Sequence, residues 1–153
     1  MNRFILVMFC LIASSSFSQS YTTAAGLKGA YYFNGGAALN VKHFLGSNNA
    51  IEACLGGGSR HIWLQGLYER NNELTHGLEW YYGFGADLGV FTNGGYVAEY
   101  SSGLFMGVDG VVGIEYTFEA FPLNLALDTG PSLRLLPYVG FGWGGGFAAR
   151  YAF

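Results

Sequence analysis

The last fourteen residues of the chain, GFGWGGGFAARYAF, separate into two columns when every second residue is taken. One column holds bulky hydrophobic residues: Phe141, Trp143, Phe147, Tyr151 and Phe153. The other column holds glycine, alanine and a single charge, Arg150. Because successive side chains of a β-strand point to opposite faces, this segment predicts a strand with one large apolar face and one small polar face.

The same period-two alternation recurs along the chain and predicts eight strands, most of them separated by stretches rich in Asn, Gly, Ser or Pro. The expected strands are Ala25–Phe33, Ala37–Leu45, Ala50–Gly58, His61–Arg70, Leu78–Phe91, Leu104–Phe118, Leu123–Gly130 and Val139–Phe153. An alternative joins residues 50–70 into one strand with a glycine kink, which gives seven strands. Bacterial single-chain barrels have even counts, so eight strands are favoured.

Charged residues fall in the column opposite the hydrophobic residues in nearly every expected strand. The inward column carries Lys28, Lys42, Glu52, Glu69, Glu79, Asp87, Asp109, Glu115, Asp128 and Arg150. The large outward residues include Trp80, Tyr82, Tyr116, Phe118, Phe141, Trp143 and Phe147. We expect the inward charges to form a network in which Arg150 contacts Asp128 and Glu52.

A few residues depart from this pattern. Arg70 falls in the apolar column at the end of its strand, and His43 does so near a turn. The strand 61–70 is the weakest, because its alternation turns Trp63 and Leu67 inward. Pro131 is consistent with the seventh strand ending near residue 130, since proline cannot donate to a central ladder.

Composition decides what the apolar column faces. Charged residues make up 11% of the chain, against about a quarter in a typical soluble domain, and aromatic residues make up 18%. A soluble barrel such as a lipocalin keeps apolar residues inside and charges outside, the reverse of this pattern. A transmembrane barrel turns apolar residues toward lipid and small or polar residues toward the lumen. The sequence therefore predicts an all-β, eight-stranded antiparallel up-and-down transmembrane barrel.

The first residues predict an export signal. A positive start at Arg3, an apolar run over residues 4–13 and small residues at Ser16 and Ser18 place the expected cleavage after Ser18. The expected domains are a signal peptide at 1–18 and a barrel domain at 19–153. Cys54 is then the only cysteine of the mature chain, so no internal disulfide is possible.

Five stretches resemble the small eight-stranded outer-membrane barrels of the OmpA/OmpX type: GLYERNN (66–72), LEWYYGFGA (78–86), GIEYTF (113–118), PLNLALD (122–128) and ARYAF (149–153). The resemblance implies a location in the outer membrane and charged networks inside a narrow lumen. It also implies that Tyr151 and Phe153 form a signal read by the barrel-assembly machinery during insertion. Long outer loops are usual in this family, whereas only the segment 92–103 is long here.

The residues offer little chemistry beyond the barrel. The three histidines are not spaced as metal ligands, the glycine stretches lack the lysine and helix of a phosphate loop, and no basic patch suggests nucleic acid. We therefore expect no catalytic residues, no metal and no cofactor. Ser59, His61 and Glu69 supply the residue types of a lipid-modifying hydrolase, but no nucleophile motif surrounds them.

The sequence favours a monomeric, non-enzymatic envelope protein with a structural or surface-interaction role. A narrow porin-like channel for small solutes is the first alternative, and a lipid-modifying outer-membrane enzyme is the second. In the expected topology, the turns at 46–49, 71–77 and 119–122 lie on the periplasmic side, and the segment 92–103 lies outside.

Overall fold

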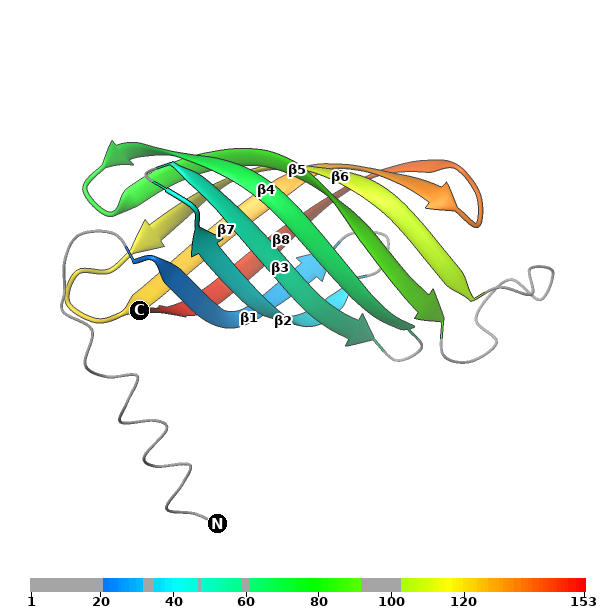
Figure 1. Ribbon diagram of the computed structural model, residues 1–153, viewed down its shortest axis with the longest axis horizontal. Helices are drawn as coiled ribbons and strands as arrows, with labels where there is room; N and C mark the ends of the chain where they lie inside the picture. The colour runs from blue at the N-terminus through cyan, green and yellow to red at the C-terminus, as the bar shows by residue number, and fades with distance from the viewer. Residues whose placement is uncertain (1–20, 32–34, 47, 59–60, 92–102) are drawn as a thin grey trace, which may run out of the picture.

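The computed structural model describes residues 21–31, 35–46, 48–58, 61–91 and 103–153. They form a closed barrel of eight antiparallel strands in which each strand pairs with its neighbours in sequence and the last pairs with the first (Figure 1). The strands are β1 (Thr23–Tyr31), β2 (Gly36–Phe44), β3 (Asn49–Gly58), β4 (His61–Thr75), β5 (Leu78–Phe91), β6 (Leu104–Thr117), β7 (Leu123–Leu136) and β8 (Gly140–Ala152). The predicted fold class and strand number are confirmed. The described part of the chain contains no helix long and apolar enough to cross a membrane.

Strand β4 is longer than the sequence predicts, because it continues five residues beyond the predicted end at Arg70. The segment 71–77 was expected to be a turn because it is polar, but Asn71 pairs with Tyr81 and Glu73 pairs with Glu79. The turn itself contains Gly77, whose φ of +76° is one that residues with a Cβ rarely adopt. The prediction of a turn at 71–77 is wrong for residues 71–75, because a polar stretch can form a strand when one of its faces meets a polar lumen.

Strand β7 is also longer than predicted: the expected end was Gly130, and the strand continues to Leu136. Pro131 lies within it and pairs with Trp143 of β8. On the other side, the register between β6 and β7 passes from the pair Asp109–Ser132 to the pair Val112–Thr129. The ladder is thus interrupted opposite the proline, which lets a residue without an N–H stay inside the sheet.

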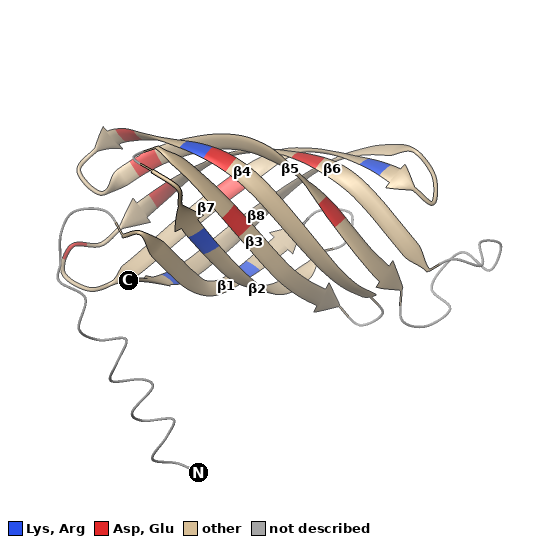
Figure 2. Ribbon diagram, in the orientation of Figure 1, with Lys and Arg blue, Asp and Glu red and all other residues tan. Residues whose placement is uncertain are grey.

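The two faces of the barrel wall differ as the alternation predicts. Large apolar side chains are exposed on the outside, with Phe84 at 69% and Phe141 at 70% exposure. The charged strand residues point inward, where Lys28 and Arg150 are each 1% exposed. Most of the charges drawn in Figure 2 lie toward the end of the barrel that carries the C-terminus. Arg70 is on the exposed face, as predicted.

Inward glycines leave room for aromatic side chains from neighbouring strands. A Cβ at Gly113 would lie 2.6 Å from the ring of Tyr81, and one at Gly56 would lie 2.5 Å from the ring of Trp63. Tyr81 packs in a buried apolar cluster with Leu67, and Trp63 packs in a second one. The inward positions predicted for Trp63 and Leu67 are therefore confirmed, and buried apolar clusters share the lumen with the buried charges.

The described start of the chain and its C-terminus lie at one end of the barrel. Thr23 and Phe153 exchange two backbone hydrogen bonds of 3.1 and 2.8 Å. The connections β2–β3, β4–β5 and β6–β7 are at this end as well (Figure 1). The expected signal peptide, the tip of the first strand at residues 32–33 and most of the long segment 92–103 lie outside the described residues.

Candidate functional site

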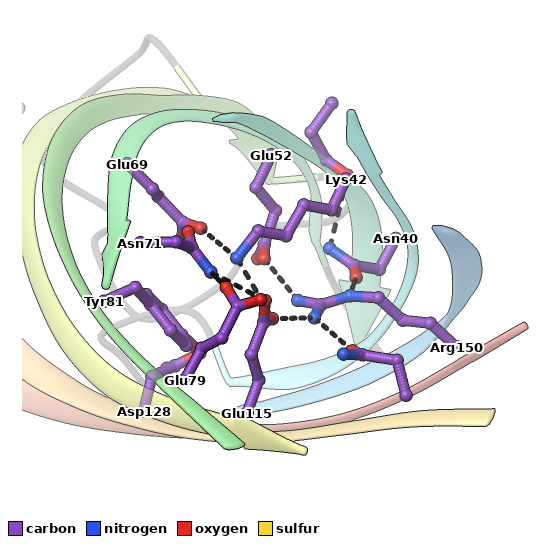
Figure 3. A network of polar contacts seen from close by, with 12 residues as sticks. Asn40, Lys42, Glu52, Glu69, Asn71, Glu79, Tyr81, Glu115, Asp128 and Arg150 are labelled. Carbon is purple, nitrogen blue, oxygen red and sulfur yellow. Dashed lines mark hydrogen bonds and ion pairs between the residues drawn. The ribbon is translucent and has the colours of Figure 1, made fainter. Parts of the chain in front are cut away.

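A network of buried charges lies inside the barrel, and Arg150 of β8 is its centre (Figure 3). Its Nη1 donates to Glu115 Oε2 at 3.3 Å and to Asn124 Oδ1 at 2.9 Å. Its Nη2 donates to Glu52 Oε2, and its Nε donates to Asn40 Oδ1. One guanidinium group therefore connects β8 to β2, β3, β6 and β7.

Two lysines connect the carboxylates that bind Arg150 to further carboxylates of the network. Lys28 Nζ lies 2.7 Å from Glu52 Oε1 and 2.7 Å from Asp128 Oδ2. A Cβ at Gly146 would lie 2.7 Å from the Lys28 side chain, so the small residue of β8 makes space for this ion pair. The role of small residues facing the lumen is thus to admit long charged side chains from neighbouring strands.

Lys42 is the second of these lysines. Its Nζ lies 2.9 Å from Glu69 Oε2 and 3.0 Å from Glu115 Oε2, and it sits 4.3 Å from the centre of the Tyr81 ring. A cation over an aromatic face is attracted by the ring quadrupole. Tyr81 in turn donates its hydroxyl to Asp128 Oδ2 at 3.0 Å, so the apolar layer is tied to the ionic one.

At the C-terminal end the network meets the rim of the barrel. Asn71 Nδ2 donates to Glu79 Oε2 and Glu115 Oε1, both at 2.7 Å, and the hydroxyl of Tyr21 donates to Glu115 Oε1 at 3.0 Å. Burial of the Tyr21 phenol, reinforced by the Glu115 carboxylate, raises the pKa of Tyr21 well above its usual value. Tyr21 therefore acts as a neutral hydrogen-bond donor that covers the network.

A separate polar group lies toward the other end of the lumen. Gln65 Nε2 donates to Asp109 Oδ2 at 2.7 Å, and the guanidinium of Arg134 lies 4.9 Å from the ring centre of Phe105. Asp87 is also buried in this part of the barrel wall. The sequence reasoning missed Arg134 because it ended the strand at residue 130. The alternation of Ser132 and Arg134 with leucines was the signal that could have included it.

Two of the ten predicted lumen charges, Asp87 and Asp109, lie apart from the Arg150 network, in the separate polar group toward the other end. The other eight belong to the network, where one predicted contact is corrected. Arg150 binds Glu52 as expected, whereas Asp128 binds Lys28 instead of Arg150. The register explains the difference, because the residue opposite Arg150 on β7 is Asn124, and Asp128 is opposite Gly146. Four residues of strand separate the two levels, about 13 Å along the chain.

Ion pairs that are this completely buried stabilise the fold only when each charged group has an oppositely charged partner. Removing a charge from water costs several kcal/mol per ion, which the mutual attraction offsets when the geometry is good and hydrogen bonds satisfy the remaining positions. Glu52 and Arg150 are 0% and 1% exposed, and each has at least two partners. The arrangement of these groups is therefore that of cross-links between strands.

The predicted outward aromatic residues are exposed, with one difference at Phe118. Trp80 and Tyr82 stack at 5.4 Å on β5, and Phe141, Trp143 and Phe147 are more than half exposed on β8. Phe118 lies one residue beyond β6, is half-buried, and stacks on Phe121 at 4.8 Å. Tyr151 and Phe153 are exposed at the C-terminal end, next to Leu123 and Thr23 respectively.

The histidines are placed individually. His43 Nδ1 lies 2.8 Å from Thr23 Oγ1 on the outside, His61 Nε2 lies 3.2 Å from the Gly35 carbonyl oxygen, and His76 contacts Glu119 at 3.0 Å. Across the described ranges, no group of three or more His, Cys, Asp or Glu side chains could hold a metal ion.

A closed eight-stranded antiparallel barrel with an apolar exterior and a charged interior defines the class of architecture to which the small OmpA-type barrels belong. Among solved structures, the chain is similar to the N-terminal β-barrel domain of Pseudomonas aeruginosa OprF, with a TM-score of 0.66 and 14% sequence identity. The similarity covers 88% of this chain and 100% of that domain. The predicted likeness to OmpA-type barrels is therefore confirmed at the level of the fold. No family model matches the sequence, and no curated protein matches it significantly.

Proposed function

We propose that this chain is an integral outer-membrane β-barrel protein with a non-enzymatic envelope-structural or surface-interaction role. The observation that carries the proposal is the reversed distribution of polarity across the barrel wall. Large apolar side chains are exposed on all eight strands or the turns beside them, while the strand charges other than Arg70 and Glu73 point into the lumen.

The free-energy argument for a lipid environment is direct. Contiguous exposed apolar patches on soluble monomers rarely exceed a few hundred Å². Here Leu27 and Leu39 on β1 and β2 are 62% and 63% exposed, and Phe84 on β5 and Phe147 on β8 are 69% and 53% exposed. An apolar surface that continues around a closed barrel matches the hydrocarbon core of a bilayer, and closure leaves no unpaired strand edge inside it.

The non-enzymatic role is supported by the separation of the residue types that a hydrolase would need. His61 and Glu69 are both on β4, eight residues apart, which is about 26 Å of extended strand. Glu69 contacts Lys42, and His61 contacts the Gly35 carbonyl. Ser59 lies outside the described residues.

A narrow channel is the second candidate, and the composition of the lumen is what favours it. Seven inward carboxylates (Glu52, Glu69, Glu79, Asp87, Asp109, Glu115 and Asp128) accompany four inward cations (Lys28, Lys42, Arg134 and Arg150). A conducting form would therefore select cations. The ion pairs across the lumen nevertheless favour a barrel that does not conduct, because eight strands leave an interior that side chains can fill.

The proposed partners follow from the same surface. Outer-membrane lipids contact the apolar wall, and Tyr151 and Phe153 on the closing strand are the proposed contact with the barrel-assembly machinery. We expect a monomer, because the charged residues that could specify a subunit interface are mostly inside the barrel.

Cell fractionation of a tagged chain tests the location, and the mobility of unboiled samples on gels tests the fold. We expect the protein in the outer-membrane fraction as a heat-modifiable band. Deletion of the gene should sensitise cells to detergent and leave lipid A unchanged by mass spectrometry. Altered lipid A would favour the enzyme, and recovery in the soluble fraction would contradict the proposal.

Cysteine labelling tests the orientation in a Cys54→Ser background. Residue 73 is close to the end that carries the C-terminus, whereas β5 ends with Phe91 at the opposite end, two positions before Asn93 in the sequence. We expect Asn93→Cys to react with an impermeant maleimide on intact cells, and Glu73→Cys to react only after the outer membrane is breached. Reversed labelling would overturn the proposed orientation.

A further inference from the structure

Three fully enclosed side-chain oxygen atoms in one part of the lumen have no hydrogen-bond partner: both carboxyl oxygens of Glu69, a residue that is 0% exposed, and Oδ1 of Asn71, which is 2% exposed. Glu69 Oε2 forms an ion pair with Lys42 Nζ at 2.9 Å, whereas Glu69 Oε1 and Asn71 Oδ1 have no polar contact among the described residues. The two residues are separated by one position on β4, so their side chains leave the strand on the same face and are neighbours along the lumen. Buried polar atoms are nearly always paired, so two adjacent acceptors without a donor call for a physical explanation.

The orientation of Asn71 is fixed by its other contacts. Its Nδ2 donates to the carboxylates of Glu79 and Glu115, both at 2.7 Å. Rotating the amide by half a turn would place its oxygen against those two carboxylates, which is repulsive. Asn71 Oδ1 is therefore an acceptor that points away from Glu79 and Glu115 and needs a donor from elsewhere.

Glu69 is a fully buried carboxyl group with one cation partner, which it shares with a second carboxylate. Its Oε2 lies 2.9 Å from Lys42 Nζ, but Lys42 also contacts Glu115 at 3.0 Å. Glu52, in contrast, contacts both Lys28 and Arg150, and Glu115 contacts both Lys42 and Arg150. Glu79 is half-buried near the rim.

The whole cluster has an excess of acidic groups. The ionisable groups that share the network with Glu69, from the surrounding strands and the N-terminal segment, are Lys28, Lys42, Glu52, Glu79, Tyr81, Glu115, Asp128, Arg150 and Tyr21. With Glu69 included, five carboxyl groups accompany three cations, an excess of two if all are ionised. An unpaired ionised group away from water is costly and is usually neutralised by taking up a proton.

We infer that Glu69 is a proton-binding site: its carboxyl group stays neutral at neutral pH, donates its O–H to Asn71 Oδ1 and accepts from Lys42 through the other oxygen. A single proton then satisfies both unpaired oxygen atoms and lowers the acidic excess of the cluster from two to one. The unfolded chain would release this proton in mildly acidic solution, whereas the folded barrel keeps it. Stability must therefore fall as the pH rises above that range, because the folded state binds more protons than the unfolded state.

The test compares Glu69→Gln with the matched control Glu52→Gln, each refolded in detergent micelles and unfolded by urea across a pH series. Glutamine has the shape of a neutral glutamic acid, and its amide can donate to Asn71 Oδ1 and accept from Lys42. We expect Glu69→Gln to match the wild-type midpoint in acidic solution, below the range in which the unfolded chain releases the proton, and to exceed it increasingly as the pH rises through neutral, because only the wild type loses stability there. Glu52→Gln removes a paired anion and should lower the midpoint clearly at neutral pH.

Infrared difference spectra detect the proton directly. We expect the wild type minus Glu69→Gln spectrum to show the carbonyl stretch of a protonated carboxyl group, shifted on transfer to deuterium oxide. A carboxylate band in its place would overturn the inference, as would a Glu69→Gln variant that fails to fold or is as unstable as Glu52→Gln. Dependence of the wild-type midpoint on added Na⁺ or Mg²⁺ together with the carboxylate band would assign the site to a metal cation instead. Because these measurements need only the folded barrel in detergent, they do not depend on the proposed location or role.

Discussion

A lysine placed at the middle of the closing strand is a quantitative test of which face meets hydrocarbon. Phe147 is in the outward column of β8, is 53% exposed, and pairs with Gly29 of β1 and Leu127 of β7. It lies six residues from Phe141 and six from Phe153. Phe147→Lys therefore introduces an ammonium group at the centre of the apolar column, and Phe141→Lys introduces the same group at its edge.

The expected magnitudes follow from the strand geometry. Six residues span about 20 Å of strand, or roughly 14 Å along the membrane normal at a tilt of about 45°. Half of an apolar band about 25 Å tall is shorter than this distance, so Phe141 sits at the interface when Phe147 is at the midplane. A lysine costs roughly 2–4 kcal/mol at the midplane and about 0–1 kcal/mol near the interface.

The assay is reversible urea unfolding in phospholipid vesicles, read from the heat-modifiable band and from tryptophan fluorescence. Both variants lose a phenylalanine, so the difference between them isolates the depth of the charge, and Phe147→Leu controls for the lost ring. We expect Phe147→Lys to be less stable than Phe141→Lys by roughly 2–3 kcal/mol, which is about 30- to 150-fold in the unfolding constant. Equal stabilities of the two lysine variants would refute the assignment of this face to lipid.

Two further substitutions test the interior. Arg150→Ala leaves the buried carboxylates of Glu52 and Glu115 without their shared cation, and we expect a loss of roughly 3–5 kcal/mol in urea unfolding; a loss below about 1 kcal/mol would contradict the cross-linking role. Gly146→Leu should displace Lys28 and cost about 1–3 kcal/mol by overpacking, whereas Gly29→Leu should be tolerated because a Cβ there has no atom within 4 Å. Equal losses for the two glycine variants would contradict the assigned inner and outer faces.

The alternation of side chains made the barrel and its two faces predictable, because a period of two fixes the face of every residue once one face is known. Lys28, Glu52 and Arg150 could be assigned to the lumen without any knowledge of the fold. The ends of strands were harder to predict. The polar segment beginning at Asn71 and the proline at 131 have the composition of turns, yet both lie in strands. Asn71 is in a strand because that strand faces a polar lumen, and Pro131 is in a strand because the ladder with β6 is interrupted opposite it.

Contacts between inward residues depend on strand register, which alternation does not reveal. Asp128 and Asn124 share a face of β7, and only the pairing with β8 shows that Asn124 is the one opposite Arg150. The same limit applies to Ala148→Lys, for which alternation alone predicts only a small loss of stability because the new lysine would face the polar lumen. Ala148 is 0% exposed and pairs with Lys28, so a second lysine there would meet both a filled space and a like charge.

Conductance in planar lipid bilayers tests the central claim, that a cross-linked charge network fills the lumen of a membrane-spanning barrel. Arg150, Lys28 and Lys42 each bind two carboxylates, and these contacts connect strands around the barrel. We expect the purified wild type to insert with little or no steady conductance, and Arg150→Ala to show intermittent cation-selective events because carboxylates are then in still greater excess. Large and stable channels from the wild type would contradict the filled lumen and favour the pore.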